Sequence, residues 1–415
     1  MPKRNCRIPA HTVRGCLVFL FFSFFLASVP GTTWAGGLYL LEYNTPSMGV
    51  AGAGAEAVAA DASTTWHNAA GMTLLEGREL MVGAGLIYAT AKFDPDPSTP
   101  ISGGDGGDAG GPAPVLSAFY VHSLSEKWKL GISLGSLSGA SLDYDDSWTG
   151  RFLVQEVTLL TVTAAPAIAY RVNDWLSVGG SVLVTYGKLD MTLAALPPPA
   201  PGNGQVEIED ADDVEVGFQL GALFRLSERA RLGIIYRSEI EPDFSGDVKI
   251  NPLGIQAGID TSIAFAQTVR AGVYFDLNEK IALLSSVAWE DWSSLENQII
   301  STQRGSATIP RGWDDTWHVS GGIHYRLFPD WLLQAGIAYD SSPVDAEDRT
   351  PDLPIDRQWR YSLGAQHDFS ERFSAGGQFV YADYGDAEIN NSLLVGDYER
   401  NSIFFFACNL NWRFD

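Results

Sequence analysis

The sequence lacks long apolar runs beyond its N-terminus, is short of basic side chains and has few cysteines. A membrane-spanning helix needs roughly 20 consecutive apolar residues, and no segment after residue 35 supplies them, which excludes a helical membrane protein. Against 50 Asp and Glu the chain has 27 Lys and Arg, and such an acidic surface repels nucleic acid. Of the 3 cysteines, Cys6 and Cys16 lie near the N-terminus, which leaves Cys408 without a disulfide partner in the mature chain.

Residues 1–35 have the pattern of a cleaved secretory signal. They begin with basic residues, continue with an apolar run at residues 17–29 and end on Thr33-Trp34-Ala35. The run is too short to span a bilayer as a helix. The chain is therefore expected to be exported, and a closed β-barrel is the other structure that satisfies every backbone polar group in lipid. This favours the outer membrane of a Gram-negative-type bacterium.

A short turn of one chemistry recurs six times, with small and acidic residues at its centre and alternating apolar and polar residues on both sides. The turns lie at residues 124–128, 172–175, 226–229, 277–280, 328–331 and 369–372. Six hairpins, with one further strand before and one after, predict an all-β fold: a fourteen-stranded antiparallel transmembrane barrel. The long polar loops expected on the outer side are residues 94–112, 143–151, 194–213 and 341–356.

The alternation within the strands indicates which face meets lipid. In residues 175–188, Val178, Val182 and Val184 share one face, while the opposite face carries small and polar residues. In residues 317–326 the second face is openly polar, with His318 and His324 on it. Aromatic residues bracket many strands, as in interfacial girdles. A polar interior and an apolar exterior favour a membrane barrel, and a large soluble all-β protein is the alternative.

The segment between the signal and the first strand predicts a plug. Residues 36–78 are rich in Ala and Gly, include a helical-looking stretch at residues 51–65 and show no strand alternation. A fourteen-stranded barrel is too wide for its own side chains to fill. We therefore expect residues 36–78 to form a partly helical hatch inside the lumen and residues 79–415 to form the barrel. A periplasmic tail is the alternative for the first of these segments.

Several motifs resemble one family. Asn68-Ala69-Ala70-Gly71, Tyr236-Arg237-Ser238-Glu239 and above all residues 336–344, which read Gly-Ile-Ala-Tyr-Asp-Ser-Ser-Pro-Val, are similar to the FadL/TodX family of outer-membrane transporters for long-chain fatty acids and hydrocarbons. The resemblance runs from Gly36 to Phe414. It implies a lumen closed by an N-terminal hatch, and sideways release of apolar ligands into the membrane through a gap made by a kinked third strand.

The resemblance also implies site residues. Leu38 stands where the family has a pocket aromatic, Asn68 and Gly71 belong to the hatch motif, and the kinked strand falls at residues 131–139. Three basic residues are the candidates for holding a ligand carboxylate, and each is as readily part of a wall charge ladder. The candidate ligand-binding or transport residues are Leu38, Asn68, Gly71, Gly135, Ser136, Lys188, Arg237 and Arg311.

The expected function is passive uptake of a hydrophobic small molecule through the outer membrane, with a general diffusion porin for small polar solutes as the alternative. No enzyme activity, metal or cofactor is expected. The nucleophile-elbow pattern at residues 131–135 lies within a strand and not at a strand-to-helix turn. His318 and His324, six apart on a strand, are about 20 Å distant, too far for one metal. The expected partners are outer-membrane lipid and the barrel assembly machinery, which would read the aromatic residues of the last strand, and the protein is expected to be a monomer. The sequence leaves the particular ligand open.

Overall fold

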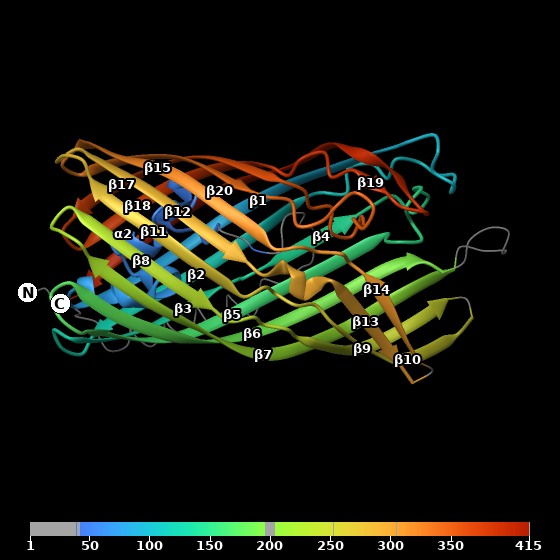
Figure 1. Cartoon of the computed structure of the whole chain (residues 1–415), viewed down its shortest axis with the longest axis horizontal. Coiled ribbons are helices and arrows are strands. Elements are labelled where there is room, and N and C mark those ends of the chain that lie inside the picture. The colour runs from blue at the N-terminus through green and yellow to red at the C-terminus, as the bar shows by residue number, and fades with distance from the viewer. Residues whose placement is uncertain (1–38, 40–41, 196–203, 252, 304, 415) are drawn as a thin grey trace, which may run out of the picture. The chain divides into compact units, whose positions relative to one another are not determined.

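The computed structural model describes residue 39 and residues 42–195, 204–251, 253–303 and 305–414, which form a closed β-barrel with a plugged lumen (Figure 1). The expected signal segment and Leu38 lie outside these described residues. Within the described part of the chain, no helix is long and apolar enough to cross a membrane.

The strands form one antiparallel sheet that closes on itself, because β1 pairs with β20 from Arg78↔Phe414 to Pro95↔Gly396. Five strands of the barrel are each interrupted once, and β19 is a two-residue pairing in an outer loop, so fourteen strands form the barrel wall, as predicted. The interrupted strands are β3 with β4, β8 with β9, β10 with β11, β12 with β13 and β14 with β15. The bounds are β1 Arg78–Pro95, β2 Pro112–Ser123, β3 Trp128–Gly135, β4 Gly139–Asp143, β5 Glu156–Arg171, β6 Leu176–Ala194, β7 Gln205–Arg225, β8 Ala230–Arg237, β9 Asp243–Asn251, β10 Ile255–Ser262, β11 Thr268–Asp276, β12 Ile281–Glu290, β13 Asn297–Thr302, β14 Gly305–Pro310, β15 Thr316–Phe328, β16 Trp331–Asp340, β17 Gln358–Ser370, β18 Phe373–Asp383, β19 Ile389–Asn390 and β20 Val395–Phe414, with a short helix η3 at Trp292–Leu295.

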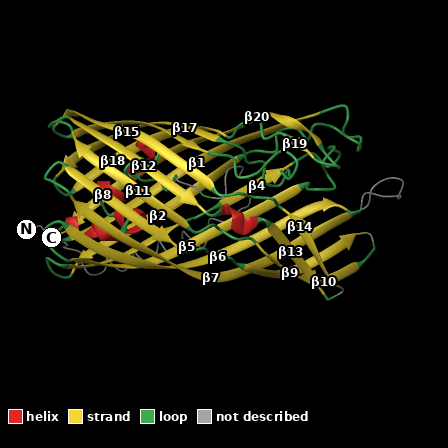
Figure 2. Ribbon diagram, in the orientation of Figure 1, coloured by secondary structure: helices red, strands yellow, loops and turns green. Residues whose placement is uncertain are grey.

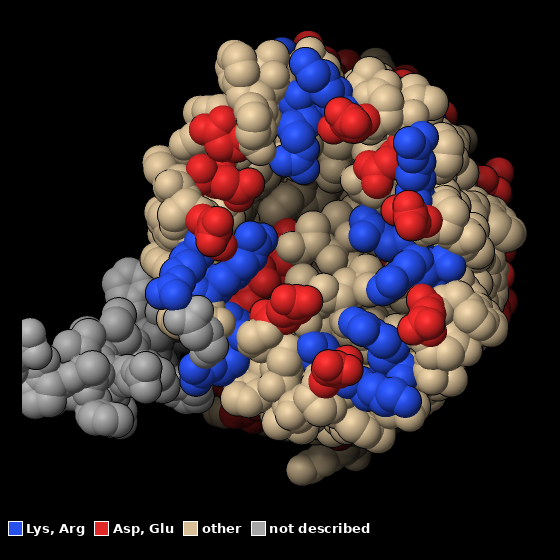
Figure 3. Space-filling model, turned by 90° about the vertical axis from the view of Figure 1, so that its left-hand side faces the viewer, with Lys and Arg blue, Asp and Glu red and all other residues tan. Residues whose placement is uncertain are grey.

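All six predicted turns join consecutive strands, and they lie together at one end of the barrel (Figure 2). Their geometry repeats: Leu124 N–H donates to the carbonyl of Trp128 at 3.0 Å, and Leu277 N–H donates to that of Ile281 at 2.9 Å. Charged side chains of both signs crowd the rim of this end, while mostly uncharged residues fill its middle (Figure 3). The longer connections lie at the opposite end.

The faces of the strands also follow the predicted alternation. On β6, Val178, Val182 and Val184 are 40%, 47% and 38% exposed, whereas Ser181 and Thr185 on the opposite face are buried. On β15, His318 and His324 are buried inside, as the polar face requires. A continuous apolar surface of this size is stable only against another apolar medium. The exposed band is therefore the surface that meets the acyl chains of the membrane.

One predicted outer loop is wrong in extent. Of residues 194–213, only a short connection between β6 and β7 remains, because β7 begins at Gln205 and residues 196–203 lie outside the described part. The acidic stretch that follows is held as strand by pairing on both sides, with Glu207 opposite Thr192 of β6 and opposite Lys249 of β9. A β-bulge at Asp210, whose φ is 52°, interrupts this pairing. The barrel wall thus extends beyond its apolar band as an acidic rim.

The plug, here Tyr39 and residues 42–77, contains four short helices and not one continuous helix over residues 51–65. Positive φ angles interrupt this stretch: Ala51 ends η1, Gly54 precedes α2 and Ala59 ends α2. Helix η1 contacts β16, β17 and β18, helix α2 contacts β8 and β11, and helix η2 contacts β5 and β6. The plug therefore touches strands around most of the wall. The helices are η1 Pro46–Val50, α2 Ala55–Val58, α3 Thr64–His67 and η2 Ala69–Leu74.

The wall meets the plug through glycines, which let the two backbones approach closely. A β-carbon on Gly233 would lie 1.9 Å from the carbonyl oxygen of Glu56, and one on Gly336 would lie 2.2 Å from the carbonyl carbon of Val50. Ten inward-facing glycines on nine strands share this close contact with the plug: Gly83, Gly85, Gly131, Gly179, Gly221, Gly233, Gly272, Gly322, Gly336 and Gly364. This glycine girdle makes room for the plug at one level of the barrel.

We predict that the six turns face the periplasm and the long loops face outside, because the long loops of such barrels are extracellular. Proteinase K added to intact cells should cut within residues 96–103, which are largely exposed, and should leave the Glu228-Arg229 bond whole. Both sites should be cut once the outer membrane is permeabilised. Cleavage of the Glu228-Arg229 bond in sealed cells would contradict the orientation.

Candidate functional site

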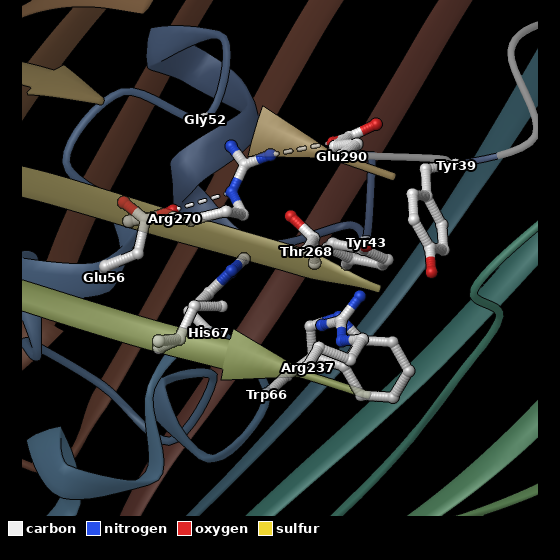
Figure 4. A pocket seen from close by; sticks show the side chains of 12 residues that line it. Tyr39, Tyr43, Gly52, Glu56, Trp66, His67, Arg237, Thr268, Arg270 and Glu290 are labelled. Carbon is white, nitrogen blue, oxygen red and sulfur yellow. Dashed lines mark hydrogen bonds and ion pairs between the residues drawn. The ribbon is translucent and has the colours of Figure 1, made fainter. Parts of the chain in front are cut away.

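A small cavity separates the plug from the wall of β8, β11 and β12 (Figure 4). The centre of a water molecule can reach about 30 Å³ of it, which is space for one or two waters. Aromatic rings and charged side chains line it together. The lining residues are Tyr39, Tyr43, Gly52, Ala55, Glu56, Trp66, His67, Ile235, Arg237, Thr268, Arg270 and Glu290.

Two further cavities share lining residues with the first. One, towards the outer loops, shares Tyr39 and Glu290 and extends to Pro343. The other shares His67 and extends to His324 of β15. His67 is bonded by Thr45 and Ser47 of the plug, with hydroxyl to Nε2 distances of 3.2 and 3.1 Å. Burial lowers the pKa of His67 to about 4, so this imidazole is neutral at pH 7.

Arg237 is one of two arginines that line the first cavity, the other being Arg270. Arg237 is the last residue of β8 and is 6% exposed, and its Nε and Nη2 donate to Oε1 of Gln219 at 3.1 and 3.0 Å. Its guanidinium carbon lies 6.0 Å from the ring centre of Tyr39 and 5.7 Å from that of Trp66. Within the described part of the chain, no carboxylate lies within ion-pair distance of it. A buried guanidinium with only a neutral partner is a site prepared for an anion.

Arg270 holds the plug by a buried ion pair. Its Nε donates to Oε1 of Glu56 on α2 at 2.9 Å, and its Nη1 lies 3.5 Å from Oε1 of Glu290 (Figure 4). Ser286 donates its hydroxyl to the other Glu56 oxygen at 2.6 Å. Burial alone would raise the pKa of Glu56, but the charge of Arg270 and the hydrogen bond from Ser286 outweigh it, so this pKa lies below its ordinary value.

A second buried arginine repeats this arrangement on β17. Nε of Arg360 lies 3.2 Å from Oε1 of Glu42 in the plug, and its Nη1 bonds Asp340 of β16. Asp340 also contacts Nδ1 of His318 at 2.8 Å. Arg270 and Arg360 thus bind carboxylates of the plug, which fixes the plug to the wall at two points.

The third strand is broken where the glycines predict. β3 pairs with β5 as far as Gly135↔Thr163, and β4 resumes at Gly139↔Leu160, so three residues face two across a β-bulge. On the other side of the third strand, only residues 118–123 of β2 pair with it. Residues 112–117 of β2 pair with β1 but not with the third strand. The backbone pairing returns at Asp143, whose N–H donates to the carbonyl of Ala109 at 3.0 Å. Between these points lies a window in the hydrogen-bonded wall.

The predicted hatch and strand-three residues lie at these contacts. Asn68 donates from Nδ2 to the carbonyls of Glu56 and of Ala222 on β7, at 2.8 and 3.0 Å, and so ties the plug to itself and to the wall. Gly71 lies against Thr64, where a β-carbon would come within 2.1 Å of the hydroxyl oxygen. Gly135 and Ser136 flank the start of the break, and Ser136 donates its hydroxyl to the carbonyl of Ser138 at 2.9 Å.

Of the three basic candidates, only Arg237 reaches the cavity. Lys188 shares the outward face of β6 with Tyr186 and pairs with Asp190 at 2.6 Å, so its ammonium group is turned away from the lumen. Arg311 is buried in the break between β14 and β15, where its Nη1 and Nη2 bond the two oxygens of Asp352 at 2.9 and 2.7 Å. The carboxylate of Asp352 already occupies the place that a ligand would take.

Sequence reasoning missed Gln219, Arg270, Glu56 and Trp66. The alternation of inward and outward residues along a strand gave a usable signal for Gln219 and Arg270, since both occupy inward positions on strands whose outer faces are apolar. Glu56 and Trp66 lie within an Ala-rich plug whose helices follow no predictable period. A lone Glu in an apolar stretch signals a buried partner, but it does not say which strand supplies that partner.

A barrel with an apolar exterior, a lumen filled by its own N-terminal segment and a window in its wall is the architecture of a transport protein of the bacterial outer membrane. The model of one family, described as outer membrane protein transport protein (OMPP1/FadL/TodX), matches residues 26–414. The chain belongs to this family.

Named relatives agree with this assignment. The long-chain fatty acid transport protein of Salmonella typhi is 25% identical over an alignment that covers 94% of this chain and 97% of the relative. The crystal structure of a Pseudomonas aeruginosa FadL homologue has a TM-score of 0.83 at 20% identity and covers 91% of this chain and 100% of that one. The Pseudomonas putida toluene transporter TodX has a TM-score of 0.69 at 16% identity, with coverages of 92% and 100%. At these identities, the two structures show a common fold.

We predict that Glu56→Ala loosens the plug and leaves the barrel intact, because it breaks the ion pair between α2 and Arg270 and leaves this buried guanidinium only Glu290, at 3.5 Å. Removing one partner of a buried pair costs up to about 3–5 kcal/mol. Single-channel recordings should show ion conductance that the wild type lacks. Glu209→Gln is the control, since Glu209 pairs with Lys249 on the exposed rim, where an ion pair contributes about 0–1 kcal/mol. If the conductance of Glu56→Ala equals that of the wild type, the Glu56–Arg270 ion pair does not hold the plug in place.

The Glu56–Arg270 ion pair also makes the stability of the plug depend on pH. Since the pKa of Glu56 is lowered in the folded protein from its ordinary 4.5, its stabilisation of the plug is complete above pH 4.5 and is lost as the pH falls through the lower folded value. His67, whose pKa is lowered to about 4 in the folded plug, adds a loss of stability that begins as the pH falls below about 6.5, because the opened plug would bind a proton there. Hydrogen exchange of plug amides, corrected for the intrinsic rate, should therefore begin to accelerate below about pH 6.5 and accelerate further below pH 4.5, where the contribution of Glu56 is lost.

Proposed function

We propose that the protein is a passive uptake channel for apolar molecules with an anionic head group, of which long-chain fatty acids are the simplest. The observation that carries the proposal is Arg237, a buried cation without a carboxylate partner in the described part of the chain, set among the rings of Tyr39 and Trp66. The protein's relatives, which include a long-chain fatty acid transport protein and a toluene transporter, support the substrate class. In this proposal, the protein carries out no covalent chemistry.

Capture begins at the outer rim in this proposal. The inner face of the rim carries apolar side chains that are only partly buried, among them Leu153, Met191, Val248 and Ile300. They continue into the buried core around Phe244 and Ile259. An apolar tail would gain about 25 cal/mol for each Å² of surface that it buries there. The acidic outer face would repel anionic ligands and leave this inner face as the favourable place to bind.

Transport then requires the plug to rearrange. Binding pockets for molecules of drug size measure roughly 300–1,000 Å³, and the described cavity offers about 30 Å³. A fatty acid can therefore occupy the Arg237 site only in another arrangement of the plug. A ligand shifts such an equilibrium by the difference between its affinities for the two states, and no other energy source is needed.

We propose the window beside β4 as the exit. A regular ladder would pair every N–H and C=O of the wall and seal the barrel, whereas residues 112–117 and β4 leave the wall unpaired beside Gly135. An apolar molecule that leaves there enters lipid and avoids periplasmic water. The general porin alternative needs a water-filled lumen, which the plug occupies. A porin would conduct ions with the plug in place, so the conductance of the wild type separates the two functions.

We predict that Arg237→Met raises the half-saturation concentration for uptake of a labelled long-chain fatty acid about 10- to 100-fold, because a charged hydrogen-bond partner contributes about 1.5–3 kcal/mol. Lys188→Met removes the same charge from the outward face and should leave uptake unchanged. If the two variants behave alike, the Arg237 site is not the head-group site.

Deletion of Ser136 tests the exit. It removes the extra residue of the bulge, so the third strand would face β5 two against two and run straight beside β2. Fatty acid uptake should fall about tenfold or more as the ladder closes. Deletion of Asp210 is the matched control, since it removes the extra residue of a bulge in the outer rim. Both variants should show the heat-dependent gel shift of a closed barrel, and normal uptake after deletion of Ser136 would refute lateral release.

A further inference from the structure

A single amide connects Arg237 of the cavity to the plug. Gln219 of β7 lies directly opposite Arg237 of β8 in the register. Its Oε1 accepts from Nε and Nη2 of Arg237 at 3.1 and 3.0 Å, and its Nε2 donates to the backbone carbonyl of Trp66 at 3.0 Å. Gln219 and Trp66 are 2% and 3% exposed. The cation fixes the orientation of the amide, because a flipped amide would point its NH₂ group at the guanidinium.

Trp66 stands between this cation and the window. Its ring centre lies 5.7 Å from the guanidinium carbon of Arg237 (Figure 4), and the far edge of the same indole faces Gly135, where a β-carbon would meet it at 3.6 Å. Gly135 is the last residue of β3 before the break. The indole therefore fills the space between the head-group site and the start of the window.

The indole is held without a directional bond of its own. Its buried Nε1 has no hydrogen-bond partner among the described residues. The ring is kept in place by packing, including Tyr43 at 5.0 Å between ring centres, by the attraction of Arg237 for its face and by the bond from Gln219 to the Trp66 carbonyl. Two of these three restraints depend on Arg237.

A carboxylate at Arg237 would remove both restraints. The Nε and Nη2 edge of a guanidinium binds a carboxylate through two parallel bonds, and charge-assisted bonds of this kind are roughly twice as strong as neutral ones. That edge is now bound to the neutral oxygen of Gln219. An incoming carboxylate would displace this oxygen, free the amide that holds the Trp66 carbonyl and neutralise the charge that attracts the ring.

We propose that Gln219 and Trp66 form a gate that opens the path from the head-group site to the window only when an anionic head group binds Arg237. This inference rests on the proposed lateral release. Gln219 is a positioning residue that transmits the occupancy of Arg237, and Trp66 is the obstruction. The gate makes the channel selective for apolar anions over neutral hydrocarbons of equal length, because a hydrocarbon has no group that competes with the Gln219 oxygen.

The chain contains a matched arrangement that cannot act in this way. Gln298 of β13 also accepts from Nε and Nη2 of an arginine, Arg311, at 3.0 and 2.6 Å. There the guanidinium already has the carboxylate of Asp352, and the Gln298 amide donates to the hydroxyl of Thr261 at 3.0 Å. The same change at Gln298 therefore controls for the chemistry of the substitution.

The test measures uptake of a labelled long-chain fatty acid and of the alkane of equal chain length by cells that have no other such transporter. The wild type should favour the acid. Trp66→Ala should raise alkane uptake so that the ratio of acid to alkane falls about tenfold, since each factor of ten corresponds to about 1.4 kcal/mol of discrimination. Gln219→Glu places a permanent carboxylate beside Arg237 and should likewise raise alkane uptake while lowering affinity for the acid. Gln298→Glu should keep the wild-type ratio.

Conductance separates a gate from a damaged plug. Trp66→Ala and Gln219→Glu should not conduct ions in planar bilayers, because the Glu56–Arg270 and Glu42–Arg360 pairs remain. If ion conductance rises together with alkane uptake, the plug has come loose and the gate is refuted. Should Trp66→Ala fail to reach the membrane, Trp66→Leu and Gln219→Glu carry the same test.

Deletion of Ser136 separates the gate from the exit. Combined with Trp66→Ala, it should abolish the extra alkane uptake. If deletion of Ser136 reduces uptake but Trp66→Ala and Gln219→Glu keep the wild-type ratio, the gate is wrong and lateral release stands. If deletion of Ser136 changes nothing in either background, lateral release fails, and the gate fails with it.

Discussion

The structure depends on buried ion pairs between the plug and the wall. Glu56 meets Arg270 and Glu42 meets Arg360, and all four side chains are removed from water. Such pairs contribute little net stability relative to an apolar core, but breaking one strands a charge at high cost. They therefore determine the position of the plug and contribute little to the free energy of unfolding. Arg237, the cavity cation that lacks such a pair in the described chain, is the residue at which we propose that an outside anion binds.

The fold could be predicted from the sequence because a barrel repeats local rules. The six turns, the outward row of Val178, Val182 and Val184 and the glycines that flank the break at residues 136–138 depend on neighbours in sequence. The outer rim was not predicted, because the alternation of Val206 and Ile208 with Glu207 and Glu209 spans only a few positions before the bulge at Asp210 interrupts it. The acidic residues of β7 form strand through their pairing with β6 and β9, which is a long-range fact.

The site was predictable in part. The alternation of the strands is enough to place Lys188 on the outward face of β6 with Tyr186 and Arg237 on the inward face of β8. The bond of Arg311 to Asp352, 41 positions later, has no local signal. The structure of the plug could not be predicted either, because its contacts are also with residues distant in sequence. Its Ala-rich sequence, with positive φ at Gly52, Gly54 and Ala59, follows no helical period and takes its shape from the wall.

The glycine girdle also limits how the plug can move. Gly233 admits the plug backbone at one height of β8, and the next inward residue towards the outer end is Ile235, roughly 7 Å further along the barrel. A rigid plug that slid along the axis like a piston would push its backbone into such side chains on many strands at once. Steric overlap therefore blocks axial translation of the whole plug. A single segment can still refold in place while the rest of the plug keeps its contacts with the glycine girdle. The barrel thus favours small, local changes of the plug over its ejection.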